Sequence, residues 1–351
     1  MAQLPQVPVK PGVKPPYQLI VYEPGKKYNL PLILNPRQLV EQRRPAILPG
    51  HRLCAGCAAP IIVKLASLAF RGPTIVVNAT GCVEVATTIF PYTSWAVPWI
   101  HNAFENAAAT ASGVESALKA MKKTGRLPYD HIDVVVFAGD GGTFDIGLQS
   151  LSGMAERGHD VLYILYDNEA YMNTGIQRSG GTPQFAWTTT SPVGKVLPGK
   201  TQTKKPIADI MVAHRIPYVA TGTPAHWIDF IKKVRKGIEV DGPAFIHAFS
   251  SCNRGWRHDT AVTIELSRRA VDTCYFPLWE WEPGVGYKLT DRSLAIARNP
   301  KLKQPIEKFV ELQGRFKHLL KPENRHLLKQ FQEYVDAVWE DLLNRAVNAP
   351  K

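Results

Sequence analysis

A glycine-rich turn with two aspartates, GDGGTFDIG at residues 139–147, directly follows the apolar run DVVVFA. Glycines let the backbone approach a ligand closely, and free N–H groups at the start of a helix bind phosphate oxygens. Asp140 would repel a bare phosphate, so a phosphate bound here needs a cation between the two groups. The turn contains neither a P-loop nor a G-x-G-x-x-G pattern. It therefore predicts either a metal-bridged phosphate site or a turn whose glycines serve only the backbone geometry.

A second polar segment, DNEAYMNTG at residues 167–175, begins at the end of the apolar run VLYILYD. Residues 133–168 have the length of one strand–helix–strand unit, about 30 residues, so both polar segments should open at one edge of a parallel sheet. Neighbouring strands lie about 4.8 Å apart, which lets Asp140 and Asn168 face one small ion. Carboxylate and amide oxygens are hard ligands that suit Mg²⁺ or Ca²⁺.

Four of the five cysteines share a relation to this edge. Cys82 follows the strand-like run TIVVNAT and Cys252 follows PAFIHAF, while Cys54 and Cys57 form a C-x-x-C pair in CAGC. Ligands gather at the carboxyl ends of parallel strands, so the four thiols are expected at the same edge. Four thiolates suit Zn²⁺ or a [4Fe–4S] cluster, and unconnected buried thiols are the third interpretation. Cys274 has no partner pattern and is interpreted as structural.

The elements that must position these residues alternate between strands and helices. Short β-branched runs predict buried strands, and an alanine-rich segment and a spaced apolar face predict helices. This alternation predicts an α/β fold with a mostly parallel sheet and helices on both faces. Residues 184–206 are predicted to form a loop, and the tail from about 291 is helical in pattern. The predicted strands are 74–80, 133–139, 161–167 and 243–249, and the predicted helices are 103–123 and 144–155, stopped by Gly158.

Composition and charge bound the class of protein. The chain has 351 residues, 45% hydrophobic residues and a net charge of +12. No apolar run reaches the ~18–20 residues of a membrane span, and the first residues lack the apolar core of a secretory signal, so a cytoplasmic location is expected. Residues 1–53 hold ten of the 28 prolines and eight Lys or Arg against two Glu. No zinc-finger spacing or aromatic RNA-binding motif accompanies this charge, which argues against a nucleic-acid partner.

Two long segments resemble the β subunits of the pyruvate:ferredoxin oxidoreductase (pyruvate synthase) family. They are ATGCVEVATTIFPYTSWAVPWIHNAFENAAATASGVESAL and AGDGGTFDIGLQSLSGMAERGHDVLYILYDNEAYMNTGIQRSGGTP. GDG followed about 28 residues later by Asn also resembles the thiamine diphosphate (TPP) motif of the wider TPP-binding fold. The similarity runs from about residue 50 to about residue 260. It divides the chain into a proline-rich basic extension (1–49), a TPP- and iron–sulfur-binding α/β domain (50–260), and a largely helical C-terminal segment (261–351) that packs on the domain or on a partner subunit.

The resemblance implies a cofactor site at the two polar segments. It assigns Mg²⁺ to the Asp140 and Asn168 side chains and the Ala170 carbonyl, and it places Asn173 near the thiazolium and the substrate as the catalytic candidate. Glu169 belongs to the same cofactor-binding segment, although its side chain is expected to matter less than the neighbouring backbone. The glycines implied to line the diphosphate are Gly139, Gly141 and Gly142.

The resemblance also implies that Cys54, Cys57, Cys82 and Cys252 hold a [4Fe–4S] cluster close to TPP. One departure is visible after the last of these cysteines. Relatives commonly have Cys-Pro-x-Gly-Trp, whereas this chain has CNRGW at residues 252–256. The Gly-Trp pair is retained and the proline is not, which affects the expected loop geometry more than the role of Cys252.

Two further groups received a structural interpretation. His101 and Glu105 lie four residues apart and are predicted to form a buried polar pair near the cofactor, with metal binding as the alternative. The segment WEWEPG at residues 279–284 is predicted to contribute packing only.

The implied function is the TPP- and [4Fe–4S]-binding subunit of a 2-oxoacid:ferredoxin oxidoreductase. Such an enzyme converts pyruvate and coenzyme A (CoA) to acetyl-CoA and CO₂ with reduction of ferredoxin, or runs the reverse synthesis. IFPYTSW and GIQRSG favour pyruvate over other 2-oxoacids, of which oxalate and 2-oxoglutarate are the alternatives. A non-oxidative TPP decarboxylase with structural zinc is a second interpretation, and a non-enzymatic electron-transfer or scaffold subunit is a third.

Partner chains are part of this expectation. TPP enzymes need a glutamate that hydrogen-bonds the aminopyrimidine ring, and this chain offers no convincing candidate. In the family that glutamate, the CoA site and further clusters belong to other subunits, of α, γ and δ type. The basic surface is expected to face these subunits or to steer an acidic ferredoxin toward the complex.

Overall fold

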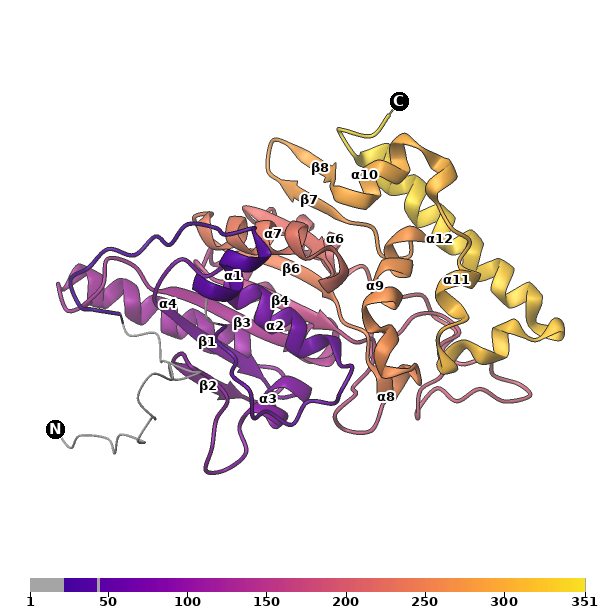
Figure 1. The fold of residues 1–351 in the computed structure, drawn as a ribbon, viewed down its shortest axis with the longest axis horizontal. Helices are drawn as coiled ribbons and strands as arrows, with labels where there is room; N and C mark the ends of the chain where they lie inside the picture. The colour runs from indigo at the N-terminus through magenta and orange to yellow at the C-terminus, as the bar shows by residue number, and fades with distance from the viewer. Residues whose placement is uncertain (1–21, 43–44, 351) are drawn as a thin grey trace.

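The computed structural model describes residues 22–42 and 45–350 of the chain, with the side chains of residues 40–42 left aside. Residues 1–21, the first part of the predicted proline-rich extension, lie outside the described residues. Figure 1 shows the described chain as a central sheet with helices on both faces and a group of C-terminal helices at one end.

Eight strands form one sheet in the order β2-β1-β3-β4-β6-β5-β7-β8. The first six strands along the chain pair in parallel, whereas β7 pairs antiparallel with β5, and β8 pairs antiparallel with β7. The predicted α/β class with a mostly parallel sheet is therefore confirmed. The strands are β1 (Thr74–Ala79), β2 (Trp99–Asn102), β3 (Asp133–Gly139), β4 (Leu162–Asp167), β5 (Tyr218–Gly222), β6 (Ala244–Phe249), β7 (Trp279–Glu282) and β8 (Gly286–Leu289).

Strand β3 shows how the sheet is buried on both sides. Its successive side chains point to opposite faces, so Val134 and Val136 enter one hydrophobic core while Val135 and Phe137 enter the other. The first core is covered by α4 (Ala107–Lys123), α5 (Leu148–Glu156) and α6 (Ile207–Ala213). The second is covered by α2 (Ala58–Leu68) and α7 (Trp227–Glu239). A sheet covered on both faces reads in sequence as continuous apolar runs, which is why these strands were recognisable.

The C-terminal segment builds a third core beyond the end of β6. Phe249, Trp256, Phe309 and Phe331 meet in it, and the long α12 contributes residues both here and to the first core. The boundary predicted after residue 260 stays a prediction, although the sheet itself continues past it through β7 and β8. The short helix α8 (Asn253–Trp256) precedes this segment, whose helices are α9 (Thr263–Asp272), α10 (Asp291–Arg298), α11 (Glu307–Val310) and α12 (Arg325–Arg345).

The remaining helical elements are short. Two α-helices, α1 (Pro36–Gln42) and α3 (Cys82–Thr87), lie in the first part of the chain, and η1 (Gly141–Asp145) is a π-helical turn. Short stretches of 3₁₀-helix occur at η2 (Pro224–His226), η3 (Thr260–Val262), η4 (Pro300–Leu302), η5 (Gly314–Leu320) and η6 (Pro322–Asn324).

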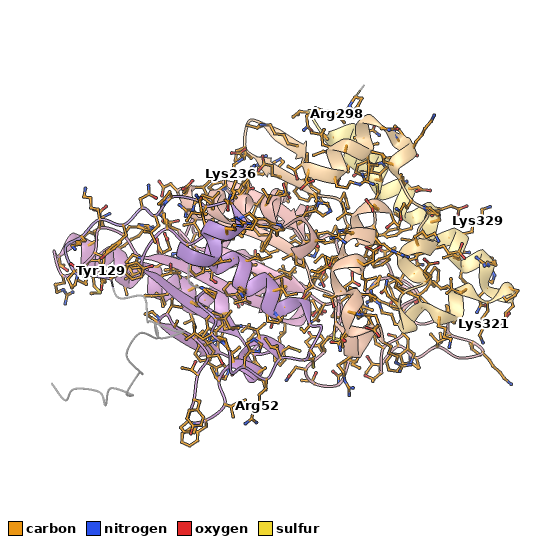
Figure 2. The ribbon with its side chains drawn as sticks, in the orientation of Figure 1. Arg52, Tyr129, Lys236, Arg298, Lys321 and Lys329 are labelled. Atoms are coloured by element: carbon orange, nitrogen blue, oxygen red, sulfur yellow. The ribbon has the colours of Figure 1, made fainter. Side chains whose placement is uncertain are left out.

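Basic side chains are distributed over the periphery. Figure 2 shows Arg52, Arg298, Lys321 and Lys329 at well-separated parts of the outline. All four are exposed, so the positive charge is spread beyond the N-terminal extension. No helix in the described part of the chain is long and apolar enough to span a bilayer.

Candidate functional site

A small cavity lies at the carboxyl ends of β1, β3 and β4. Strands β3 and β4 are direct neighbours, with Gly139 opposite Tyr166, so the segments that follow them open at one edge of the sheet as predicted. Seven of the predicted cofactor-binding residues line this cavity together with Cys82: Gly139, Asp140, Gly141, Gly142, Asn168, Ala170 and Asn173. The other lining residues are Thr80, Gly81, Phe104, Tyr166, Tyr171, Met172 and Thr174.

The glycine-rich segment begins with a π-helical turn instead of the expected α-helix. The Thr143 and Phe144 N–H groups both donate to the Asp140 carbonyl, at 3.1 and 2.7 Å. A Cβ at Gly147 would overlap the Gly142 carbonyl, and a Cβ at Gly142 would lie 2.9 Å from the Phe104 carbonyl oxygen. The glycines are therefore required by the close backbone approach, and regular α-helix starts only at α5. Wide turns of this kind are frequent at functional sites.

Three of the predicted metal ligands converge at the mouth of this turn. One terminal atom of the Asn168 amide lies 3.1 Å from Asp140 Oδ1 and 2.9 Å from the Ala170 carbonyl oxygen. With nitrogen at this position the amide donates to both oxygens, and with oxygen there the three atoms form a triangle of oxygens. Adjacent ligands of an octahedral Mg²⁺ lie about 3.0 Å apart, since each Mg–O bond is about 2.1 Å. The donor set and its spacing therefore fit Mg²⁺.

Electrostatics favour a cation at Asp140. The carboxyl is only 2% exposed, and Ser179 Oγ donates to its Oδ2. Burial and the neighbouring Asp167 raise the pKa of Asp140 well above its ordinary value, because both disfavour the charged form. Asp140 forms no ion pair among the described residues, and the more distant Lys204 lowers its pKa by less than burial and Asp167 raise it.

Asp167 has the opposite balance although it is equally buried. Its Oδ2 lies 2.5 Å from Lys204 Nζ and 2.6 Å from His247 Nε2. Burial alone raises the pKa of Asp167, but Lys204 and His247 outweigh this effect and hold the pKa below its ordinary value. Two neighbouring carboxyl groups with pKa values shifted apart carry different tasks. Asp167 is neutralised by the protein, and Asp140 is available to a ligand.

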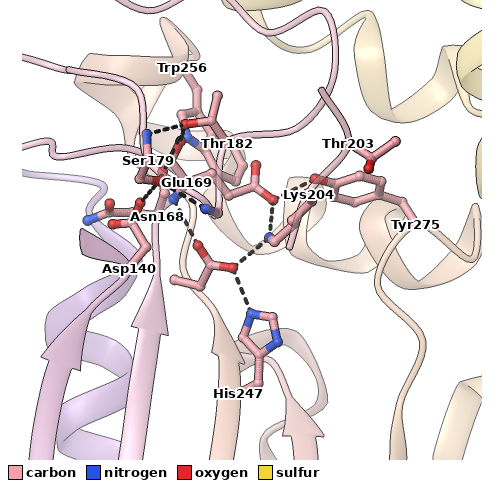
Figure 3. Close-up of polar contacts among 12 residues, drawn as sticks. Asp140, Asn168, Glu169, Ser179, Thr182, Thr203, Lys204, His247, Trp256 and Tyr275 are labelled. Atoms are coloured by element: carbon pink, nitrogen blue, oxygen red, sulfur yellow. Dashed lines mark hydrogen bonds and ion pairs between the residues drawn. The ribbon is translucent and has the colours of Figure 1, made fainter. Parts of the chain in front are cut away.

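Glu169 turns its side chain away from the cavity into the same buried network (Figure 3). Its carboxylate lies 2.7 Å from Lys204 Nζ and 2.6 Å from the Arg315 guanidinium, and Tyr275 Oη donates to it at 2.6 Å. Glu169 was predicted to belong to the cofactor-binding segment with a minor role. Its side chain contacts these three residues, while the backbone of the segment faces the cavity.

The four predicted cluster cysteines gather beside the cavity. The Cys57 N–H donates to the Cys54 carbonyl at 3.1 Å, and the next N–H along the chain donates to the carbonyl of Ser251, the residue before Cys252. Burial, with smaller contributions from Cys252 and Cys54, raises the pKa of Cys57 to about 12. The same cysteines raise the pKa of the Cys82 thiol after burial. Within the described ranges, no group of three or more His, Cys, Asp and Glu side chains is arranged to hold a metal ion directly.

Several buried polar atoms without a hydrogen-bond partner belong to the segments that carry these cysteines. They include His51 Nδ1, Ser251 Oγ and Asn253 Oδ1. Buried polar groups are normally hydrogen-bonded, so unpaired ones beside the thiols suit a place where a further group completes the site. The chemistry of the four thiols and of these polar atoms suits a metal cluster beside the cavity.

The prediction for His101 and Glu105 is wrong. His101 lies on strand β2 and Glu105 in the turn after it, so the four-residue spacing does not bring the two side chains together. His101 is exposed and pairs instead with Glu84, at 3.4 Å between Nδ1 and Oε1. Cys274 is 1% exposed and stays interpreted as structural.

Several residues around the site carried no signal in the sequence. Lys204, His247, Tyr275 and Arg315 come from separate segments, and only the fold brings them to the Asp167–Glu169 loop. Trp256 was noted only as part of a retained Gly-Trp pair, whereas its indole N–H donates to the Asn168 carbonyl at 2.8 Å.

Comparisons with known proteins agree with this geometry. The family model "Thiamine pyrophosphate enzyme, C-terminal TPP binding domain" matches residues 79–248. Pyruvate synthase subunit PorB of Thermotoga maritima is 52% identical over 88% of this chain and 96% of its own length. Ketoisovalerate oxidoreductase subunit VorB of Pyrococcus abyssi is 47% identical over 84% of this chain and 91% of its own length.

A solved structure supports the fold. The 2-oxoglutarate:ferredoxin oxidoreductase from Magnetococcus marinus, with 2-oxoglutarate, coenzyme A and succinyl-CoA bound, superimposes with a TM-score of 0.50. The matched part covers 65% of this chain and 81% of that chain at 21% identity. A similarity at this identity supports the fold and nothing more specific. The subunit relatives carry the assignment, because about half of the residues are identical over most of both chains. The chain belongs to the thiamine-diphosphate-binding family of 2-oxoacid oxidoreductase subunits that includes PorB of pyruvate synthase.

Proposed function

We propose that this chain is the TPP- and [4Fe–4S]-binding subunit of a 2-oxoacid:ferredoxin oxidoreductase that acts on pyruvate and CoA. The overall reaction takes pyruvate, CoA and two oxidised ferredoxins to acetyl-CoA, CO₂, a proton and two reduced ferredoxins, or runs in reverse. The observation that carries the proposal is the Asn168 amide within 3.1 Å of Asp140 Oδ1 and 2.9 Å of the Ala170 carbonyl oxygen, in a cavity that Cys82 also lines. It joins a diphosphate anchor to a thiol ligand within one site.

The first part of the proposal is the cofactor anchor. Asp140, Asn168 and the Ala170 carbonyl would hold Mg²⁺ on the diphosphate, and the glycines of η1 would let the backbone approach it. Bound TPP supplies the ability to cleave the bond between the carbonyl and carboxylate carbons of a 2-oxoacid. Asn173 lines the same cavity and is proposed to contact the substrate.

The second part is the electron acceptor. Cys54, Cys57, Cys82 and Cys252 would hold a [4Fe–4S] cluster, whose role is to accept single electrons. The burial that raises the pKa of Cys57 disfavours a bare thiolate. A positively charged cluster iron offsets that cost, because a metal ligand stabilises the thiolate form.

The third part is an assembly with other subunits. No glutamate of the described chain lines the cavity, so the group that hydrogen-bonds the aminopyrimidine ring is proposed to come from a partner subunit. CoA and ferredoxin are assigned to sites that include α-, γ- or δ-type chains. A cytoplasmic location is part of the same proposal.

Anaerobic purification of the chain with its partner subunits tests the function. We expect a brown complex with about four iron atoms per copy of this chain beyond those of the partners. Its visible absorbance should bleach on addition of pyruvate and CoA. A colourless zinc protein that still releases CO₂ from pyruvate would instead support a non-oxidative decarboxylase. A cofactor-loaded complex whose absorbance no 2-oxoacid bleaches would support a non-enzymatic scaffold or electron-transfer subunit.

A second substrate follows from the relatives. The VorB relative is named for ketoisovalerate and is 47% identical, close to the 52% of the first PorB relative. The kcat/KM values for pyruvate, ketoisovalerate, 2-oxoglutarate and oxalate decide between these acids. Pyruvate is expected to have the highest kcat/KM, and a higher value for ketoisovalerate would make that acid the substrate.

A further inference from the structure

The backbone between the proposed metal ligands Asn168 and Ala170 has an uncommon conformation. Glu169, the residue between them, has a φ of 66°, in the left-handed region that side chains other than glycine seldom adopt. Such a conformation persists where surrounding contacts over-determine it. The position of both ligands depends on this peptide, so the contacts that fix it matter for the site.

Every polar group of Glu169 is held by the protein. Its N–H donates to Asp167 Oδ1 at 3.0 Å, and its carbonyl accepts from Thr182 Oγ1 at 2.7 Å. Its carboxylate receives Lys204, Tyr275 and Arg315, as described above. The side chain is fully buried, and breaking one partner of a buried ion pair is costly because it leaves an uncompensated charge.

Arg315 connects this carboxylate to Trp256. The guanidinium lies 3.7 Å from the centre of the Trp256 ring while its Nη2 donates to Glu169 Oε2 at 2.6 Å. A second bond, from Arg315 Nε to Gln313 Oε1 at 2.8 Å, fixes the plane of the guanidinium. A flat, delocalised cation is suited to stacking and hydrogen bonding at once, and lysine cannot reproduce both contacts.

Trp256 in turn holds the carbonyl of Asn168. The indole is fully buried, packs edge-on against Phe249 and donates its N–H to the Asn168 carbonyl at 2.8 Å. Figure 3 labels Trp256, Asn168 and Glu169 together at the loop that follows β4. The Arg315 guanidinium thus acts on both sides of the peptide unit between Asn168 and Glu169. It holds Glu169 through the carboxylate and Asn168 through the Trp256 indole.

We infer that Trp256 and Arg315 are positioning residues for the cofactor, which keep the Asn168 amide and the Ala170 carbonyl in the arrangement that binds the diphosphate metal. Both residues lie outside residues 79–248, the part that matches the TPP-binding family model. Through Arg315, the C-terminal segment (261–351) is therefore part of the cofactor site, in addition to covering the end of the sheet. The inference rests on the proposed function.

The test measures TPP affinity of the assembled complex after the cofactor has been removed. Mg²⁺ is kept at a fixed concentration, and thiamine diphosphate is titrated by equilibrium dialysis. Trp256→Phe removes the N–H but keeps an aromatic ring in the core. We expect the Kd for TPP to rise about fivefold to tenfold, the loss of one hydrogen bond to a buried carbonyl. Iron content should stay at the wild-type value.

A matched control separates positioning from general loosening. Trp279 is also buried, at 5% exposure, and lies on β7, so Trp279→Phe makes the same substitution at a tryptophan that has no hydrogen bond to the described Asn168–Ala170 backbone. Its Kd for TPP should equal that of the wild type. Arg315→Lys should raise the Kd, and Trp256→Phe combined with Arg315→Lys should raise it by less than the product of the two single effects. Residues that act through one peptide are expected to be non-additive in this way.

Two results overturn the inference. One is an unchanged Kd for Trp256→Phe with a lowered melting temperature, which would make the tryptophan purely structural. The other is an equal rise for Trp279→Phe, which would make the effect unspecific. A wild-type complex that binds no TPP overturns the proposed function and this inference with it. A wild-type complex that binds TPP, with Trp256→Phe equal to it, overturns the inference alone.

Discussion

Two buried carboxyl groups on adjacent strands have opposite electrostatic situations. Lys204 and His247 neutralise Asp167, whereas Asp140 keeps a carboxylate oxygen directed at the Asn168 amide and has a raised pKa. Burying the Asp140 carboxyl costs free energy in the cofactor-free protein, because its charged form is disfavoured there, and a bound cation removes that cost. The residue that costs stability in the free protein is thus the residue that the proposed metal needs, a common trade-off at functional sites.

Asp140→Asn is expected to stabilise the cofactor-free complex. The amide keeps the size of the side chain and removes the buried charge and its repulsion from Asp167. We expect a gain of about 1 kcal/mol, measured by thermal unfolding without TPP or Mg²⁺. Asp130→Asn, at an exposed position, is the control and should change little. A loss of stability for Asp140→Asn would show that the carboxylate is already neutralised by another group.

Lys200 should produce a pH-dependent stability. Burial, together with the neighbouring cations Arg178 and Lys204, lowers its pKa from 10.5 to about 8. A lysine with a lowered folded pKa binds fewer protons in the folded state than in the unfolded state. Its cost is therefore complete below about pH 8 and is relieved as the pH rises toward 10.5.

Melting temperatures of wild type and Lys200→Met between pH 7 and pH 10 check this sign. The melting temperature of the wild type should rise relative to that of the variant above pH 8, because only the wild type has a buried lysine charge that deprotonation removes. Lys195→Met, at an exposed position nearby, should show no such trend. A difference that does not vary with pH would contradict the assignment.

Among the elements, the strands and the edge of the sheet were the most predictable features. The four predicted strands match β1, β3, β4 and β6 within one residue, because each is a continuous apolar run buried on both faces. Their order also predicted that the turns after β3 and β4 face each other. Strands β2, β5, β7 and β8 were not among the predicted strands, and each is only four or five residues long.

The support of the site could not be predicted from sequence. Arg315 contacts Glu169 across 146 positions of the chain, and Tyr275 does so across 106. The residues that flank each partner in the sequence form no motif, so a contact of this kind cannot be predicted from local sequence. Motifs predict which residues bind a ligand, whereas the residues that hold the motif in place depend on the fold.

Gly147→Ala tests whether the π-helical turn needs its glycines. The new methyl group would overlap the Gly142 carbonyl, so we expect a loss of about 1–3 kcal/mol or more and weaker TPP binding. Gly113→Ala, in open space within α4, is the control and should gain about 0.5–1 kcal/mol. Thermal unfolding of both variants measures the difference. Equal stability for the two alanine variants would mean that the turn can relax at no cost.

At the scale of the whole molecule, the chain is proposed to be one part of a composite active site. The isolated chain should bind TPP with Mg²⁺ weakly but release no CO₂ from pyruvate, since no glutamate of the described residues lines the cavity. Addition of the partner subunits should restore turnover. Measurable CO₂ release by the isolated chain would show that it supplies its own activating group.

The central claim is that the metal–diphosphate anchor and the cluster thiols are distinct ligand sets at one edge of the sheet. Asp140→Ala in the assembled, anaerobically purified complex tests it most directly, with iron and TPP quantified on the same sample. We predict that TPP is lost and pyruvate-dependent bleaching is abolished, while iron stays at the wild-type level. Retention of TPP, or a loss of iron equal to the loss of TPP, would contradict this account of the site.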